Sequence, residues 1–178
     1  MALASAATFF ALLGLLDGAH STAHFAEDNA CSALRPNLLT SELVGSMPVF
    51  EVPDLTGKKL SLQQFRGKPV LVSFFATWCP PCVEEMPSLE LLAGRLGDQA
   101  KVLVVSVDED EEALKKFFHK GTNTVVTRDE SRAVPGKFGT SKFPESFLID
   151  ANGKLRHAFI NKRDWSVPEA VACIAGAK

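Results

Sequence analysis

The feature that most constrains the fold is the apolar run KPVLVSFFATW, residues 68–78, with a cysteine pair directly after it. Such a continuous run is typical of a central β-strand that is covered on both faces. A helix is predicted from about 80 to 96, and KVLVVSV (101–107) indicates a second buried strand. This order predicts two parallel strands joined by a right-handed crossover.

The remaining segments extend this unit into one α/β domain over residues 46–178. A short hairpin is predicted near its start, with the turn at Thr56-Gly57. An insertion over about 108–130 supplies a helix and a strand, and a loose stretch rich in proline and glycine follows. ESFLID and KLRHAFI, separated by ANG, predict an antiparallel hairpin before a last helix. We therefore expect a central mixed β-sheet flanked by helices on both faces.

Composition narrows the class of function. The 178 residues are 46% hydrophobic and 22% charged, with a net charge of −2, which suits one globular domain with appendages. No basic stripe is present, so no nucleic-acid partner is expected. The acidic run DEDEEALKK (108–116) is interpreted as a solvated helix face with Glu–Lys pairs at helical spacing.

The N-terminal segment suggests export. Residues 2–16 are apolar, which is short for a spanning helix but suits the hydrophobic part of a signal peptide. We therefore expect a signal peptide or N-terminal anchor over 1–23 and a linker over 24–45. No Lys or Arg precedes Arg35, so the positively charged leader of a signal peptide is missing. The alternative is a buried N-terminal helix. Export would place the chain in an oxidising compartment, where thiols exchange with disulfides.

The pair Cys79 and Cys82 lies at the predicted junction of strand and helix. Pro80 and Pro81 suit the first helical positions, because the amide hydrogens that they lack would have no partner there. The Cys79 sulfur then faces the positive end of a helix, which favours the thiolate and lowers its pKa. The thiolate is the nucleophile of disulfide exchange, so the pair is predicted to be a redox-active site.

Two other interpretations of the cysteines were considered. A zinc site needs four ligands, and one C-x-x-C motif supplies only two, so neither a metal nor a cofactor is expected. An inert structural disulfide is less consistent with a position at a helix N-terminus. Nothing in the sequence brings Cys31 and Cys173 together; we expect free thiols, with Cys173 as a small core residue of the last helix.

The motif FFATWCPPCVEEMP, Pro144 before ESFLID, and the βαβ–ββα order together resemble the thioredoxin fold. More narrowly, residues 46–178 are similar to exported thiol–disulfide oxidoreductases of the TlpA/ResA/DsbE type. The base rate for X-Pro bonds favours a trans bond before Pro144. The resemblance instead implies that Pro144 is cis and lies beside the cysteine pair.

The resemblance also implies roles for other residues. Glu85 matches an acidic residue of ResA-like active sites and is expected to handle the Cys82 proton; the alternative is a solvated glutamate like Glu84. Ser73 replaces the buried aspartate of small thioredoxins, and Glu145 replaces the threonine that often follows the cis-proline. Substrate binding is assigned to one group of residues around the pair: Trp78, Pro80, Phe143 and Pro144.

We therefore expect a monomeric protein-disulfide oxidoreductase that acts on protein thiols and disulfides, in the reducing direction. The resemblance implies a periplasmic or other extracytoplasmic site, recharging by a membrane thiol donor, and cytochrome c maturation as one common use. A peroxiredoxin is one alternative, but its motif needs a threonine three residues before the cysteine, and Thr77 is only two before Cys79. A tryparedoxin-like donor to peroxidases and a redox-inactive binding module are the others.

Overall fold

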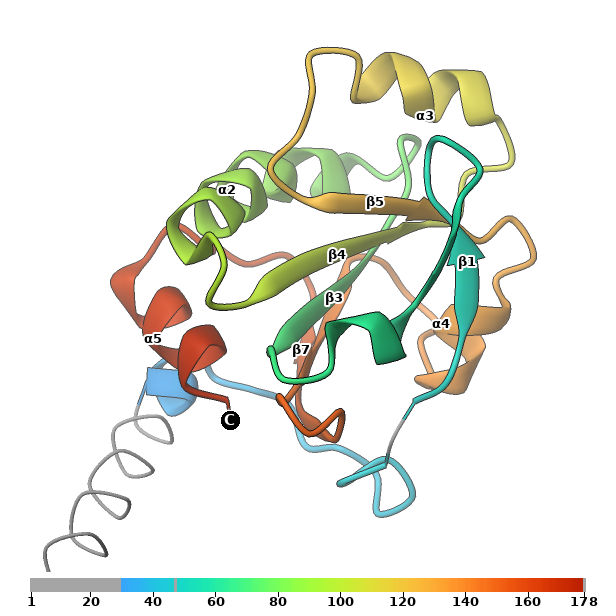
Figure 1. Cartoon of the computed structure of the whole chain (residues 1–178). Coiled ribbons are helices and arrows are strands. Elements are labelled where there is room, and N and C mark those ends of the chain that lie inside the picture. Colours follow the sequence, from blue (N-terminus) through green and yellow to red (C-terminus); the bar gives the residue numbers. More distant parts are fainter. Residues whose placement is uncertain (1–29, 47, 178) are drawn as a thin grey trace, which may run out of the picture.

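The computed structural model describes residues 30–46 and 48–177 (Figure 1). The signal peptide or anchor expected over 1–23 lies outside the described residues. Among the described residues, no helix has the length and apolar character needed to cross a bilayer. The elements follow in the order β1 (Glu51–Pro53), β2 (Lys59–Ser61), η1 (Leu62–Phe65), β3 (Val70–Phe75), α2 (Pro80–Leu96), β4 (Lys101–Ser106), α3 (Glu111–Phe117), β5 (Val125–Arg128), α4 (Ala133–Lys137), β6 (Glu145–Ile149), β7 (Leu155–Ile160) and α5 (Pro168–Gly176).

The central sheet has five strands in the order β5-β4-β3-β6-β7. Strand β3 pairs in parallel with β4 and antiparallel with β6. The parallel βαβ unit and the antiparallel β6–β7 hairpin predicted from the sequence are therefore confirmed. Strands β1 and β2 form the expected separate hairpin. The fold class, a thioredoxin-like α/β fold with a mixed sheet, is confirmed as well.

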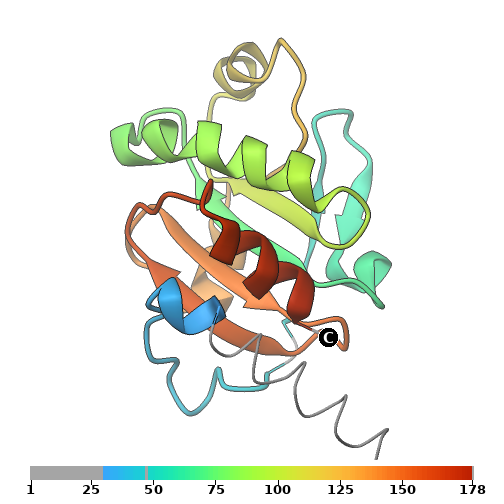
Figure 2. The same ribbon diagram turned by 90° about the vertical axis from the view of Figure 1, so that its left-hand side faces the viewer.

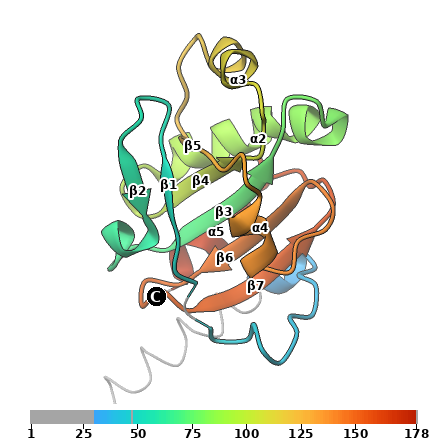
Figure 3. The same ribbon diagram turned by 90° about the vertical axis from the view of Figure 1, so that its right-hand side faces the viewer.

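Two layers cover the sheet, which explains why β3 is apolar on both faces. Helices α2 and α5 lie side by side over one face (Figure 2). Their core includes Leu71 of β3 and Trp165, both fully buried. The β1–β2 hairpin and α4 lie on the opposite side (Figure 3), where Phe74 packs against Phe138 and Phe147. All six residues of β3 are buried as a result.

Residues 30–46, here called the strap, were expected in the main to be a linker. The strap instead lies along the domain: Asn37 N–H donates to the Ala158 carbonyl of β7 at 2.7 Å, and Gly45 N–H donates to Leu155 at 3.0 Å. A helical turn at 30–33 brings Cys31 to α5. The described part of the expected linker is therefore packed against the β7 edge and α5.

The prediction of free thiols at Cys31 and Cys173 is wrong. The two residues form a disulfide across 142 positions of sequence, and both side chains are buried. The expected burial of Cys173 in α5 is confirmed. The pairing depends on the path of the strap to α5, which no local pattern in the sequence encodes.

Two further differences concern loops near the end of β3. The stretch expected to be loose contains α4, which is held at its start by Asp129: the carboxylate accepts from Val134 N–H at 2.7 Å. The acidic run is not uniformly a solvated helix face. Asp108 is buried, and Asp110 caps α3 by accepting from Glu112 and Ala113 N–H. Only the later part of the run forms an exposed helix face.

Candidate active site

The redox pair, Cys79 and Cys82, lies where β3 leads into α2. A turn follows the strand, in which Cys79 N–H donates to the Ala76 carbonyl at 3.1 Å. Cys79 is the residue directly before the helix, which begins at Pro80. The two cysteines are joined by a disulfide. Cys79 is 5% exposed and Cys82 is 1% exposed, so Cys79 is the less buried of the two residues.

The Phe143–Pro144 peptide bond is cis, which confirms the expectation drawn from the resemblance. Pro144 directly precedes β6, whose first residue, Glu145, pairs with Phe74 near the end of β3. Phe143 packs against the core cluster that contains both active-site cysteines. The proline therefore lies at the same end of the sheet as the redox pair. Burial raises the pKa of the Glu145 carboxyl that follows it.

Trp78 forms an exposed rim beside Cys79. Its side chain is 54% exposed, and its ring meets the edge of Phe143 with centroids 6.2 Å apart. The Arg132 guanidinium lies 5.5 Å from the centre of the Trp78 ring, within the range of a cation–π contact. Arg132 has a left-handed backbone, with φ of 58°, which is uncommon for a non-glycine residue. The sequence analysis did not assign Arg132, because the loop that carries it comes to Trp78 only in the fold.

The sulfur pair has a buried acid in the same helix. Glu85 is 3% exposed, so it is not a solvated glutamate. Its Oε1 atom accepts from Arg163 N–H at 2.9 Å and from the Trp165 indole N–H at 2.7 Å. Burial raises the pKa of Glu85 to about 7, and these two hydrogen bonds oppose the rise. Glu84, its neighbour, instead forms a surface ion pair with Lys162.

The loop between β7 and α5 supplies both donors to Glu85. Ser88 strengthens the same contact: its hydroxyl donates to the Glu85 carbonyl at 2.8 Å and accepts from Trp165 N–H at 3.1 Å. The sequence analysis missed Arg163 and Trp165. The signal that was available is the tryptophan itself, since a buried indole N–H usually requires a partner. At the place of the thioredoxin aspartate, Ser73 is buried in β3.

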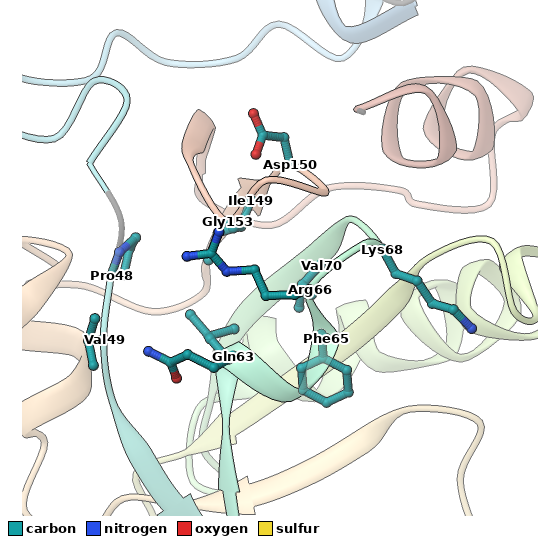
Figure 4. A pocket seen from close by; sticks show the side chains of 11 residues that line it. Pro48, Val49, Gln63, Phe65, Arg66, Lys68, Val70, Ile149, Asp150 and Gly153 are labelled. Atoms are coloured by element: carbon teal, nitrogen blue, oxygen red, sulfur yellow. The ribbon is translucent and has the colours of Figure 1, made fainter.

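Two surface pockets lie away from the redox pair. One pocket, of about 30 Å³, is lined by residues that include Gln63, Arg66 and Asp150; Figure 4 shows their side chains. This pocket adjoins Val70, at the opposite end of β3 from the redox pair. A second pocket, of about 330 Å³, lies between the β1–β2 hairpin and the segment after β5. Neither is lined by Cys79 or Cys82. Within the described residues, no three His, Cys, Asp or Glu side chains come together as metal ligands would.

A cysteine pair at a helix N-terminus, beside a cis-proline on a mixed five-stranded sheet, defines a thioredoxin-fold thiol–disulfide oxidoreductase. The family model described as Redoxin matches residues 43–174, and the chain belongs to this family. Within it, the protein is a thiol–disulfide oxidoreductase of the TlpA/ResA/DsbE type, as its relatives show.

Three similar proteins illustrate the relationship. The thiol-disulfide oxidoreductase ResA of Bacillus thuringiensis (strain Al Hakam) is 35% identical over 118 residues, which cover 65% of this chain and 68% of that protein. A Chlorobium tepidum structure, provisionally assigned as the thiol:disulfide interchange protein DsbE, is 28% identical with a TM-score of 0.63; the match covers 67% of this chain and 86% of the other. The exposed lipoprotein thioredoxin Etrx1 of Streptococcus pneumoniae is 28% identical with a TM-score of 0.56, over 62% and 87% of the two chains.

Proposed function

We propose that the protein reduces disulfides of protein substrates outside the cytoplasm, with Cys79 as the attacking residue and Cys82 as the resolving residue. The observation that carries this proposal is the position of Cys79 directly before α2, at the end of the sheet where cis-Pro144 precedes β6. The amides at a helix N-terminus stabilise a thiolate, which lowers the pKa of a reduced Cys79. Cys82, one turn further into the helix, is more buried.

The exchange has two steps. The Cys79 thiolate attacks one sulfur of the substrate disulfide, the substrate S–S bond breaks, and the departing sulfur takes up a proton. The Cys82 thiolate then attacks the Cys79 sulfur, which releases the second substrate thiol and leaves the Cys79–Cys82 disulfide. The substrate gains two electrons and two protons. A membrane thiol donor is proposed to return two electrons to the pair for the next cycle.

Glu85 is proposed as the group that takes the proton from Cys82. Resolution requires a thiolate at a buried position, where desolvation disfavours charge. An acid with a pKa of about 7 is half ionised near neutral pH, which is the condition for efficient proton transfer. Glu85 lies three residues after Cys82 in α2, a spacing that brings two side chains to one helix face.

Substrate binding is proposed at the rim formed by Trp78 and Phe143, with Pro80 and Pro144 beside it. Trp78 is a large exposed aromatic side chain, and aromatic residues are frequent anchors at protein interfaces. Phe143 directly precedes the cis bond to Pro144, and its backbone is proposed to pair with an extended substrate chain.

The proposed compartment rests on two observations. The apolar segment 2–16 suits an export signal, and the buried Cys31–Cys173 disulfide is typical of oxidising compartments. The resemblance to Etrx1, an exposed lipoprotein, is in agreement. Within this proposal the protein acts as a monomer, and cytochrome c maturation is one process that it would serve.

Trapping of the mixed disulfide tests the proposal. A full-length Cys82→Ser variant in the native host should accumulate a covalent adduct through Cys79, and mass spectrometry should identify an extracytoplasmic protein partner. A Cys79→Ser variant is the matched control and should trap nothing. Adducts with cytoplasmic proteins alone would contradict the proposed location. Rapid peroxide turnover by the purified protein, together with no adduct, would instead favour the peroxiredoxin alternative.

A further inference from the structure

Asp108 is a buried acid that the exchange steps above do not use. It lies two residues after the end of β4 and is 1% exposed. Its carboxylate accepts four hydrogen bonds from the described residues, and three of them come from Thr77, which is 31 positions away in sequence. A buried carboxylate has a high desolvation cost unless it is hydrogen-bonded in this way.

The hydrogen bonds of Asp108 hold the turn that precedes α2 and do not involve either active-site sulfur. Thr77 N–H donates to Oδ1 and Oδ2 at 3.1 and 3.0 Å, and the Thr77 hydroxyl donates to Oδ1 at 2.6 Å. Ser106 closes the arrangement from β4, with its hydroxyl 2.6 Å from Oδ2. Thr77 is the second residue of the turn in which Cys79 N–H donates to Ala76. Asp108 therefore binds the centre of the turn that places Cys79 directly before α2.

We propose that Asp108 is a positioning residue for the redox pair, acting through Thr77 to hold Cys79 at the N-terminus of α2. The inference deepens the proposed function and rests on it, since it concerns the same two cysteines. A turn released from Asp108 would let the Cys79 sulfur move relative to the helix amides. Because their stabilisation of a thiolate falls off within the first turn, the reduced thiol would then lose part of its acidity.

A comparison with Asp150 separates positioning from simple turn stability. Asp150 is 4% exposed and lies directly after β6, in the turn that begins the β7 strand. Its Oδ1 atom accepts from Asn152 N–H and Lys154 N–H, both at 2.9 Å. These partners belong to its own turn, at the end of β6 away from Pro144. Asp150 is therefore a control of equal burial with no bond to the active-site turn.

The experiment uses the full chain and two readouts. The pKa of Cys79 is measured in the reduced protein from the pH profile of iodoacetamide alkylation, and the exchange rate is measured with insulin. Asp108→Ala should raise the Cys79 pKa and slow insulin reduction by about tenfold, as expected for the loss of one to two kcal/mol of hydrogen bonding. Asp108→Asn keeps an acceptor oxygen for Thr77 and should lie within about threefold of the wild-type rate.

Two further variants isolate the link to Thr77. Thr77→Val removes the hydroxyl donor alone and should slow exchange by about threefold. The Asp108→Ala effect should not grow when Thr77→Val is added, because both changes break one contact. Asp150→Ala should lower the urea midpoint of unfolding and leave both the Cys79 pKa and the exchange rate unchanged.

The lost charge of Asp108 acts in the opposite sense, since removal of a nearby negative charge lowers a thiol pKa. A lower Cys79 pKa in both Asp108 variants would therefore overturn the positioning role. Additive effects of Asp108→Ala and Thr77→Val would overturn the positioning role as well. So would a wild-type exchange rate and a wild-type Cys79 pKa in Thr77→Val. If Asp108→Ala does not fold, the Thr77→Val measurement alone tests the role. Wild-type protein that fails to reduce insulin would contradict the proposed function, whereas the alkylation profiles still test Asp108.

Discussion

The two disulfides of this molecule are the same bond in opposite settings. Cys79 and Cys82 are three positions apart at the start of a helix, next to the exposed Trp78. Cys31 and Cys173 are 142 positions apart, and their exposed fractions are 1% and 0%. The first pair closes a single helical turn, while the second closes most of the chain into a loop.

The difference shows that the position of a disulfide in the fold decides whether it exchanges or stabilises the structure. A helix N-terminus and a solvent-near sulfur favour exchange, whereas a buried bond across a long loop restricts the unfolded chain and stabilises the fold. Among the described residues, only the first pair has an acid of raised pKa three residues away in its own helix. We therefore expect Cys79–Cys82 to turn over and Cys31–Cys173 to remain closed.

The largest expected effect separates the two pairs by activity. Cys79→Ser removes the proposed attacking sulfur, so insulin reduction should fall to the background rate. The double variant Cys31→Ala with Cys173→Ala leaves the active-site turn intact and should reduce insulin within about threefold of the wild-type rate, since sites without shared partners are largely independent. Equal loss in both proteins would break the comparison.

The second effect separates the pairs by stability. In the chain-entropy model, closure of a loop of this length contributes about 5 kcal/mol to the free energy of unfolding. Denaturant unfolding of the Cys31→Ala, Cys173→Ala double variant should show a loss of that order. The Cys79→Ala, Cys82→Ala double variant opens a far shorter loop. Its free energy of unfolding should fall by only about 2 kcal/mol in the same model. A smaller loss in the long-loop variant than in the short-loop one would contradict this assignment.

The third effect concerns the pH dependence of stability near the redox pair. Folded Glu85 keeps its proton up to a pKa of about 7, against a pKa of 4.5 for an unperturbed glutamate. Between these values the unfolded state binds fewer protons, so stability falls as pH rises, by a total on the order of 3 kcal/mol.

Glu85→Gln has no such charge to bury. It should therefore be more stable than the wild type at pH 8, and the difference should shrink toward pH 5, as urea unfolding at both values would show. Glu84→Gln is exposed and should follow the wild type. A Glu85→Gln protein with an unchanged pH profile would mean that Glu85 is not the buried titrating group.

The smallest effect sharpens the comparison by kinetics. If Glu85 accepts the Cys82 proton, Glu85→Gln should slow insulin reduction by roughly 10²-fold, which is the low end for general acid–base catalysis. The variant should also flatten the pH dependence of the rate between about pH 6 and pH 8. Glu84→Gln should do neither. Wild-type rates in Glu85→Gln across this range would remove Glu85 from the mechanism, without affecting the roles of the two cysteines.

The sequence predicts the active end of the molecule better than the rest because its signals there are local. An apolar β3, two prolines and a C-x-x-C motif are contiguous, and each constrains the next. The cis bond before Pro144 followed from resemblance, since the base rate for such bonds points to trans. Burial of Glu85 was one of two open alternatives, because helical spacing alone does not say what covers a face.

What sequence reasoning missed depends on contacts between distant segments. Asp108 looked solvated within an acidic run, and only the pairing of β3 with β4 brings it to Thr77. The partner of Cys31 depends on how the strap folds back to bring Cys31 to α5. Arg132 comes to Trp78 through a short helix in a stretch rich in proline and glycine, where propensity predicts no element.

The strap also changes how far the domain can reach. Arg163 donates to the Leu34 and Arg35 carbonyls and to Asn37, so the strap is fastened by ionic hydrogen bonds as well as by Cys31. If the 17 residues of the strap were flexible, their root-mean-square span would be roughly 20–25 Å. Because the strap is fastened to α5 and β7, residues 31–46 add none of this span between Cys31 and the rest of the domain.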